Sequence, residues 1–206
     1  MQKKGILTLA MALLVLCIVN SANAGIIDTG APDMSLLYGD DDGPDVVGGT
    51  FTADASVLVS FTLNLDFAFN AIGDAYRAVV LGTTTAGVPT VPVLWESADI
   101  TPPDSPTEVL FNVGIAIIPG LQYFIGIDSG NLTSTIGGAF GLGFRTSDVL
   151  AGGQLYQSLN TAPFFGVATV DIASRIVMAS SVPEPASLIL LTLGLAALQL
   201  GRRKTV

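Results

Sequence analysis

Four aspartates crowd a short segment near the start of the chain. Asp40, Asp41 and Asp42 are followed by a glycine, a proline and then Asp45. Calcium takes six to eight oxygen ligands, which a flexible acidic loop can supply. The spacing lacks the alternating ligands and the distal glutamate of an EF-hand. Asp40, Asp42 and Asp45 are therefore candidate calcium ligands, with a solvated acidic loop as the alternative, and calcium is the one cofactor that the sequence suggests.

Aromatic side chains offer a second chemistry, which is stacking on sugar rings. Trp95 stands in the segment Val-Leu-Trp-Glu, and Tyr156 follows the segment Gly-Gly-Gln-Leu. Stacking on a sugar needs an exposed ring face with polar groups beside it. Trp95 and Tyr156 are candidates for this role, and the alternative is that both rings pack in the core or at a strand edge.

Catalytic residue types are scarce. The chain has no histidine, and its one cysteine, Cys17, lies in the N-terminal apolar run. These facts exclude a histidine-based triad and remove the commonest general base. Residues 25–182 also lack a lysine that could activate a serine. Carboxylates such as Glu96 and Glu108 look no different from ordinary surface acids, so we predict that the protein is not an enzyme.

The N-terminus is predicted to be a signal peptide, residues 1–24. Lys3 and Lys4 precede an apolar run over residues 5–19, and Ala22 and Ala24 supply the small residues that signal peptidase accepts. Cleavage is expected after Ala24. The alternative is that this helix remains as an uncleaved membrane anchor.

The C-terminus, residues 183–206, combines a short motif, an apolar stretch and a basic tail. Its parts are Pro183, Glu184 and Pro185, the apolar residues 186–201, and Arg202, Arg203 and Lys204. As a helix, the apolar stretch would be about 24 Å long, which is slightly short of the roughly 30 Å hydrocarbon core. The basic tail is expected to stay in the cytoplasm, and this orientation places residues 25–182 outside.

This tail resembles the PEP-CTERM sorting signal of Gram-negative bacteria in its parts, their order and their position. The resemblance implies recognition by exosortase, a membrane protease-transpeptidase, and removal of the helix. Release or attachment at the cell surface would follow, often together with exopolysaccharide. Two prolines hold the chain extended, which would present Glu184 to a protease. The alternative is an ordinary membrane anchor after a proline linker.

Residues 25–182 are predicted to form one all-β domain, an antiparallel β-sandwich or jelly roll. Residues 25–49 are expected to be a lead-in rich in glycine and aspartate. From Val59 onward, apolar residues alternate with polar ones, so Val59, Phe61 and Leu63 are expected to face the core together. Strands are predicted at residues 59–69, 75–83, 91–97, 107–113, 122–128, 138–145, 154–158 and 168–178.

Three segments of this region are similar to extracellular sandwich domains akin to jelly-roll carbohydrate-binding modules. The similar segments are the strand entry at residues 119–124, the turn at residues 151–156 and the closing strand at residues 171–176. This resemblance implies the fold and not the ligand.

The net charge of the domain excludes some classes of binding partner. Residues 25–182 carry 16 acidic and three basic residues, a formal net charge of −13, which repels nucleic acid and anionic lipid. The predicted partners are signal peptidase, exosortase, the inner membrane and exopolysaccharide. We therefore predict an exported structural or interaction protein that is first anchored in the inner membrane and then reaches the cell surface or the medium. The alternative function is an extracellular carbohydrate- or calcium-binding module.

Overall fold

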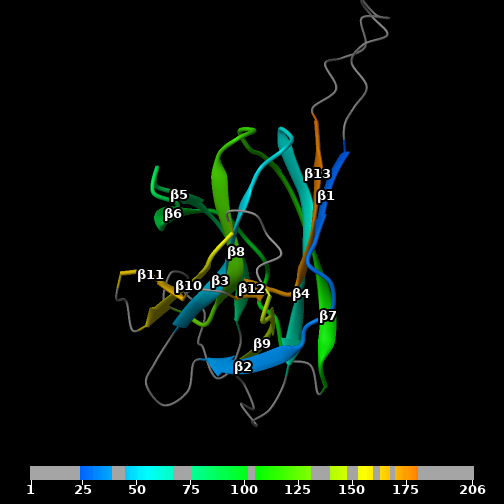
Figure 1. Cartoon of the computed structure of the whole chain (residues 1–206), viewed down its shortest axis with the longest axis vertical. Coiled ribbons are helices and arrows are strands. Elements are labelled where there is room, and N and C mark those ends of the chain that lie inside the picture. The colour runs from blue at the N-terminus through cyan, green and yellow to red at the C-terminus, as the bar shows by residue number, and fades with distance from the viewer. Residues whose placement is uncertain are drawn as a thin grey trace, which may run out of the picture. The chain divides into compact units, whose positions relative to one another are not determined.

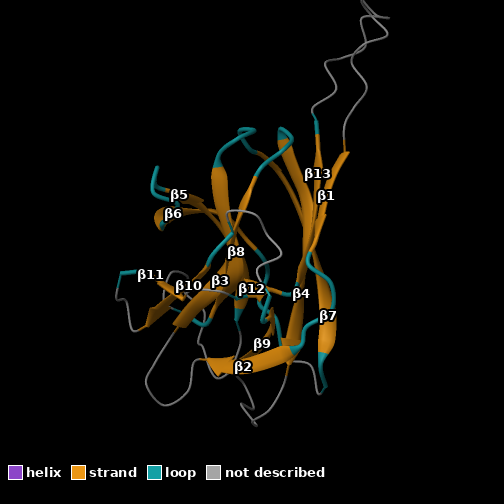
Figure 2. Cartoon of the chain, viewed as in Figure 1, coloured by secondary structure: helices purple, strands orange, loops and turns teal. Residues whose placement is uncertain are grey.

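The computed structural model contains only strands as regular secondary structure within the residues that it describes (Figure 2). These residues are 24–38, 45–66, 76–101, 105–130, 140–147, 153–159, 163–167 and 170–180. None of them belongs to a helix long and apolar enough to span a membrane. The predicted signal helix and the predicted transmembrane helix at residues 186–201 lie outside the described residues. Residues 24–179 form one compact unit.

The strands form two curled antiparallel sheets, which Figure 1 shows on opposite sides of the domain. The first sheet has the order β1-β13-β4-β9-β12, with β7 paired to β4 and β2 paired to β9. Its strands are β1 (Ala24–Asp28), β2 (Met34–Tyr38), β4 (Val57–Asp66), β7 (Thr107–Ala116), β9 (Phe140–Arg145), β12 (Asp171–Ile172) and β13 (Ser174–Ala179).

The second sheet has the order β11-β10-β3-β8-β5-β6. Its strands are β3 (Asp45–Thr52), β5 (Arg77–Thr83), β6 (Pro89–Glu96), β8 (Gln122–Asp128), β10 (Leu155–Leu159) and β11 (Phe165–Val167). Within the described residues, every strand pair in both sheets is antiparallel, as the sequence pattern predicted.

The main core lies between the two sheets. Phe61 and Leu63 of β4 meet Ile125 and Ile127 of β8 in one buried cluster. Each of these side chains is at most 1% exposed. Burial of a side chain of this size stabilises the fold by about 1.5–3 kcal/mol. The alternating pattern of β4 therefore fixes which face of the first sheet is covered by the second.

The prediction that Val59 faces the core together with Phe61 was wrong. Val59 is 39% exposed, whereas Leu58 is completely buried. The reason is a β-bulge: Val177 of β13 pairs with Ser60, and the next residue, Met178, pairs with Leu58. The extra residue in β4 shifts the alternation of inward and outward side chains by one position, so Leu58 faces the core and Val59 faces outward.

The prediction of a lead-in at residues 25–49 was also wrong, because these residues contribute to β1, β2 and β3. Strand β3 lies inside the second sheet, between β10 and β8, and its Val46 and Val47 are fully buried. Two glycines concealed this strand from the sequence pattern. The space beside Gly49 is filled by Ile172, whose Cγ1 would lie 3.0 Å from a β-carbon there.

The second sheet is buried on its outer face as well. Val46, Val79, Leu81, Phe124 and Tyr156 form a separate apolar cluster there, and each is at most 5% exposed. A sheet that is covered on both faces carries nearly continuous apolar strands. This explains why β5 and β8 lack the polar alternation seen in β4.

One buried hydroxyl joins the end of β1 to β12 and β13. Thr29 is 3% exposed. Its hydroxyl donates to the carbonyl of Ile172 at 2.9 Å and accepts the amide of Ser174 at 2.7 Å. Its own amide donates to the carbonyl of Ser174 at 3.0 Å. Thr29 thus extends the pairing of β1 with β13 beyond the last ladder pair.

The substitution Thr29→Val is expected to lower the free energy of unfolding by about 1–3 kcal/mol, because it leaves a buried amide and a buried carbonyl without partners. Urea denaturation measures this loss. The control is Thr107→Val, because the hydroxyl of Thr107 donates to the carbonyl of Ser105 in an exposed position where water can replace it. The control should change stability by less than about 0.5 kcal/mol, and equal losses in the two variants would contradict the prediction.

Candidate functional site

The two ends of the domain lie side by side. Ala24, the first residue of β1, is the register partner of Ala179, the last residue of β13, and Figure 1 shows these two strands running together. The predicted signal peptidase site therefore lies at the same end of the same strand pair as the start of the C-terminal tail. Of the predicted sorting residues, Ala24 is described, whereas Ala22, Pro183, Glu184, Pro185, Arg202, Arg203 and Lys204 lie outside the described residues.

The predicted calcium ligands are only partly covered by the structure. Asp40 and Asp42 lie outside the described residues. Asp45 is the first residue of β3 and pairs with Leu159 of β10. No group of three acidic, histidine or cysteine side chains that could hold a metal occurs within the described ranges. The calcium hypothesis stays a prediction.

The two predicted sugar-stacking rings pack in different clusters. Trp95 is half-buried against the main core, with its ring 6.0 Å from that of Phe61 in an edge-on arrangement. Tyr156 is 5% exposed in the outer cluster of the second sheet, and its hydroxyl donates to Oε1 of Gln154 at 3.1 Å. The structure does not bring these rings together into one platform, and sugar stacking by either ring stays a prediction.

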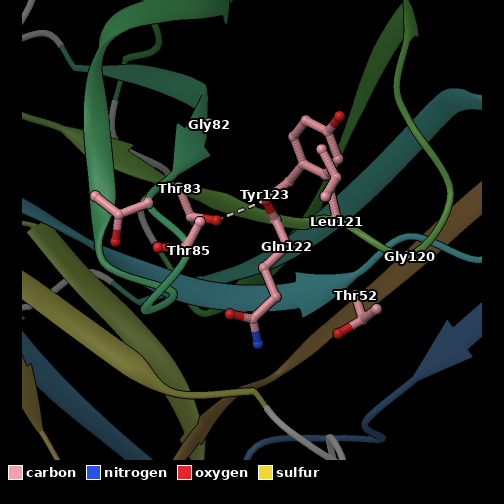
Figure 3. A pocket seen from close by; sticks show the side chains of 9 residues that line it. Thr52, Gly82, Thr83, Thr85, Gly120, Leu121, Gln122 and Tyr123 are labelled. Atoms are coloured by element: carbon pink, nitrogen blue, oxygen red, sulfur yellow. Dashed lines mark hydrogen bonds between the residues drawn. The ribbon is translucent and has the colours of Figure 1, made fainter.

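A groove of about 580 Å³ lies beside the end of the β5 strand and is shown in Figure 3. We call it the threonine groove. It is lined by Thr52, Gly82, Thr83, Thr84, Thr85, Gly120, Leu121, Gln122 and Tyr123. Its lining contains no charged side chain. A neutral lining with hydroxyl groups suits an uncharged polar ligand.

Several hydroxyls of the threonine groove are already used by the fold. The hydroxyl of Thr83 donates to the carbonyl of Gln122 at 2.8 Å, the bond drawn in Figure 3. The hydroxyl of Thr84 accepts the amides of Ala86 and Val88 at 3.2 Å. Part of the polar lining of the threonine groove therefore serves to stabilise the fold, including the turn between β5 and β6.

A second groove, of about 500 Å³, lies on the outer face of the first sheet. We call it the sheet groove. Unlike the threonine groove, it contains charged residues, namely Asp28, Glu108 and Arg175. No motif in the sequence marks Asp28 or Arg175 as a candidate site residue. The available signal was that Arg175 is one of only three arginines in residues 25–182 and directly precedes the apolar residues 176–179.

The other two arginines of the domain are engaged in ion pairs. Arg77 contacts Glu96 at 3.3 Å and Asp99 at 2.7 Å. The hydrogen bond to Asp99 raises the pKa of the Arg77 guanidinium. Arg145 lies 3.9 Å from Asp33. These pairs attach loops to strands, so they account for both arginines without a ligand.

Fold and tail together define a class of protein: a β-domain followed by a C-terminal sorting signal. Residues 181–204 match the family described as the PEP-CTERM protein-sorting motif. The match covers the C-terminal tail only. The chain therefore carries a PEP-CTERM sorting motif in this tail, which supports the prediction that it is a substrate of exosortase. The motif implies export, a membrane-anchored precursor and sorting to the surface.

The domain is similar in fold to parts of two solved structures. One is the clostridial cysteine protease Cwp84 after propeptide cleavage, with a TM-score of 0.52 and 13% identity over 77% of this chain and 40% of that one. The other contains the cysteine protease and lectin-like domains of Cwp84, a surface layer associated protein of Clostridium difficile. Its TM-score is 0.44, with 13% identity over 71% of this chain and 36% of that one.

The chain spans about two fifths of the first of these structures, and identity at this level indicates the fold alone. The search of curated proteins finds no match to the chain.

Proposed function

We propose that this chain is a structural or interaction protein of the cell surface or biofilm matrix, delivered there by exosortase. The observation that carries the proposal is the pairing of Ala24 with Ala179. Ala179 lies only two residues before the start of the matched motif. Both processing sites would then lie at one end of the domain. The rest of the domain would face the extracellular medium.

The boundary between domain and tail supports this proposal. Strand β13 ends at Ala179, and the matched motif starts at residue 181. Removal of the apolar segment 186–201 would therefore take no strand from either sheet. The domain would keep its core after processing, as a protein that acts at the surface must.

A binding or structural role fits the residue types better than catalysis does. Residues 25–182 contain neither histidine nor cysteine, so a cysteine–histidine or serine–histidine mechanism has no residues to use. The lining of the threonine groove includes hydroxyl and amide groups, and that of the sheet groove includes hydroxyl, amide and carboxylate groups. These groups favour, as the second candidate, a carbohydrate-binding module of the jelly-roll kind.

The experiment that tests the proposed function compares the native protein from strains with and without exosortase. With exosortase, the intact mass should correspond to a chain without residues 1–24 and without the apolar segment 186–201, found at the surface or in the medium. Without exosortase, the tail should remain and the protein should stay in the inner-membrane fraction. Recovery of the same full-length species from both strains would refute the proposal.

A further inference from the structure

Arg175 differs from the other arginines of the domain because it has no ion pair with any described residue. It is exposed on the outer face of β13. In the ladders it stands between Asp28 of β1 and Thr62 of β4. The carboxylate of Asp28 instead accepts the amide of Gly30 at 2.8 Å. The guanidinium of Arg175 therefore remains available to a ligand.

The side chain of Arg175 lines the sheet groove, whose volume of about 500 Å³ lies within the range of roughly 300–1,000 Å³ typical of ligand sites. Four strands and one loop contribute to its lining. The lining residues are Ile26 and Asp28 from β1, Gly30 and Ala31 from the following loop, Thr62 and Asn64 from β4, Glu108 from β7, and Ser174 and Arg175 from β13.

The polar side chains of the sheet groove keep hydrogen-bonding capacity after the fold has used part of it. The hydroxyl of Thr62 accepts the amide of Arg175 at 3.1 Å, so its proton is free to be donated. Nδ2 of Asn64 donates to the carbonyl of Ala173 at 3.2 Å, and its Oδ1 has no partner among the described residues. Glu108 is exposed opposite Asn64 in the ladder and adds two acceptor oxygens.

These groups are held by a rigid frame. Strand β13 is paired on both sides, with β1 and with β4, and β4 is also paired with β7. Thr29 adds a buried hydrogen bond at the end of β1, directly beside the groove residue Ser174. Polar groups fixed on strands lose little entropy when they bind, and they can select a ligand by the spacing of its own polar groups.

The mixture of donors and acceptors favours a ligand with many hydroxyl groups. Arginine, asparagine and glutamate each present two hydrogen-bonding atoms in one plane, which match two adjacent hydroxyls of a sugar ring. A protein partner would need a buried aromatic or large apolar anchor, and the described lining offers only Ile26 and the small Ala31. A metal ion would be repelled by the guanidinium of Arg175 between the two carboxylates.

The charge of the groove indicates which class of sugar polymer fits. Asp28 and Glu108 outnumber Arg175, and residues 25–182 as a whole carry a net charge of −13. An anionic polysaccharide would be repelled by this field. We propose that the sheet groove binds a neutral polysaccharide, with Arg175, Glu108 and Asn64 hydrogen-bonding its ring hydroxyls. The proposal deepens the proposed function and rests on it, because it assumes that the domain acts outside the cell.

The test is affinity electrophoresis of the purified full-length protein in detergent, in gels that contain a neutral glucan, mannan, galactan or xylan, with alginate as an anionic comparison. We expect at least one neutral polymer to retard the protein and alginate not to. The variants Arg175→Gln and Glu108→Gln should each weaken that binding by about tenfold or more. Both positions are exposed, so both variants should keep the far-ultraviolet circular dichroism of the parent.

The matched control is Thr101→Val, an exposed substitution outside both grooves, which should bind as the parent does. Three results would overturn the proposal: no retardation by any neutral polymer, retardation by alginate alone, or unchanged binding by both groove variants. The processing of Arg175→Gln by exosortase is measured in parallel. Normal processing of a parent protein that binds no polysaccharide would refute only the proposal that the sheet groove is a binding site. Absence of processing in the parent would refute the proposed function.

Discussion

A chain in which Pro183-Glu184-Pro185 is replaced by Ala-Gln-Ala is expected to remain in the inner membrane with its C-terminal tail intact. The matched family motif spans residues 181–204, and these three residues precede its apolar stretch. Proline cannot donate an amide hydrogen bond, and it restricts the residue before it to extended backbone. Alanine and glutamine instead favour helix, so we expect the predicted helix at residues 186–201 to continue through the motif and close it to the protease.

The expected change is from complete processing to none, measured by intact mass and by membrane fractionation. Glu184→Gln keeps both prolines and removes the charge alone, so accumulation of precursor in this variant would show that exosortase reads the carboxylate. The control is Thr205→Ala, which lies beyond the matched residues and should be processed normally. A mature product of normal mass from the Ala-Gln-Ala chain would contradict the role assigned to the motif.

The largest loss of stability is expected for Gly126→Ala in the second sheet. Gly126 of β8 pairs with Gly48 of β3, and the ring of Phe124 covers both glycines. A β-carbon at Gly126 would overlap the carbonyl oxygen of Val47 and lie 2.7 Å from Cζ of Phe124. Optimal contacts between carbon atoms are about 3.5–4.0 Å. Relief requires the β3–β8 ladder to move, because the obstructing oxygen belongs to the backbone.

We expect Gly126→Ala to lower the free energy of unfolding by about 3 kcal/mol, which corresponds to a fall in Tm of about 6–12 °C for a domain of this size. Thermal and urea denaturation measure both quantities. Gly82→Ala is the matched control, because a β-carbon there would meet Thr90 Oγ1 at 3.7 Å and Leu94 Cδ1 at 4.0 Å, which are ordinary contacts. The free energy of unfolding of the control should stay within about 0.5 kcal/mol of that of the parent. Similar losses in the two variants would show that the close packing around Phe124 is not the cause of the loss of stability.

The elements that the sequence predicted well are those with a strong local pattern. Residues 107–113 and 122–128 were predicted as strands and form β7 and β8. The predicted strand at residues 168–178 is instead two strands, β12 and β13. They separate at Ala173, whose amide donates to the carbonyl of Gly143. Short-range alternation reveals extended backbone but contains no information on which strand a given amide will pair with.

The failures have a common physical origin in contacts between distant segments. Strand β3 looked like a glycine-rich lead-in because Gly48 and Gly49 lack side chains. Their space is taken by Phe124 and Ile172, more than 70 residues further along the chain. Val59 looked like a core residue because the bulge that turns it outward depends on the register with β13.

By itself, the sequence determined the all-β class, the charge and the sorting signal. Composition and charge do not depend on which segments are in contact, and the signal is one contiguous stretch of chain. The tertiary structure alone decided that Ala24 meets Ala179 and that Asp28, Glu108 and Arg175 share one groove. Antiparallel pairing aligned these residues from segments up to about 150 positions apart. The hydrogen bonds and buried side chains that set this register are made between segments, so no single segment of the sequence contains them.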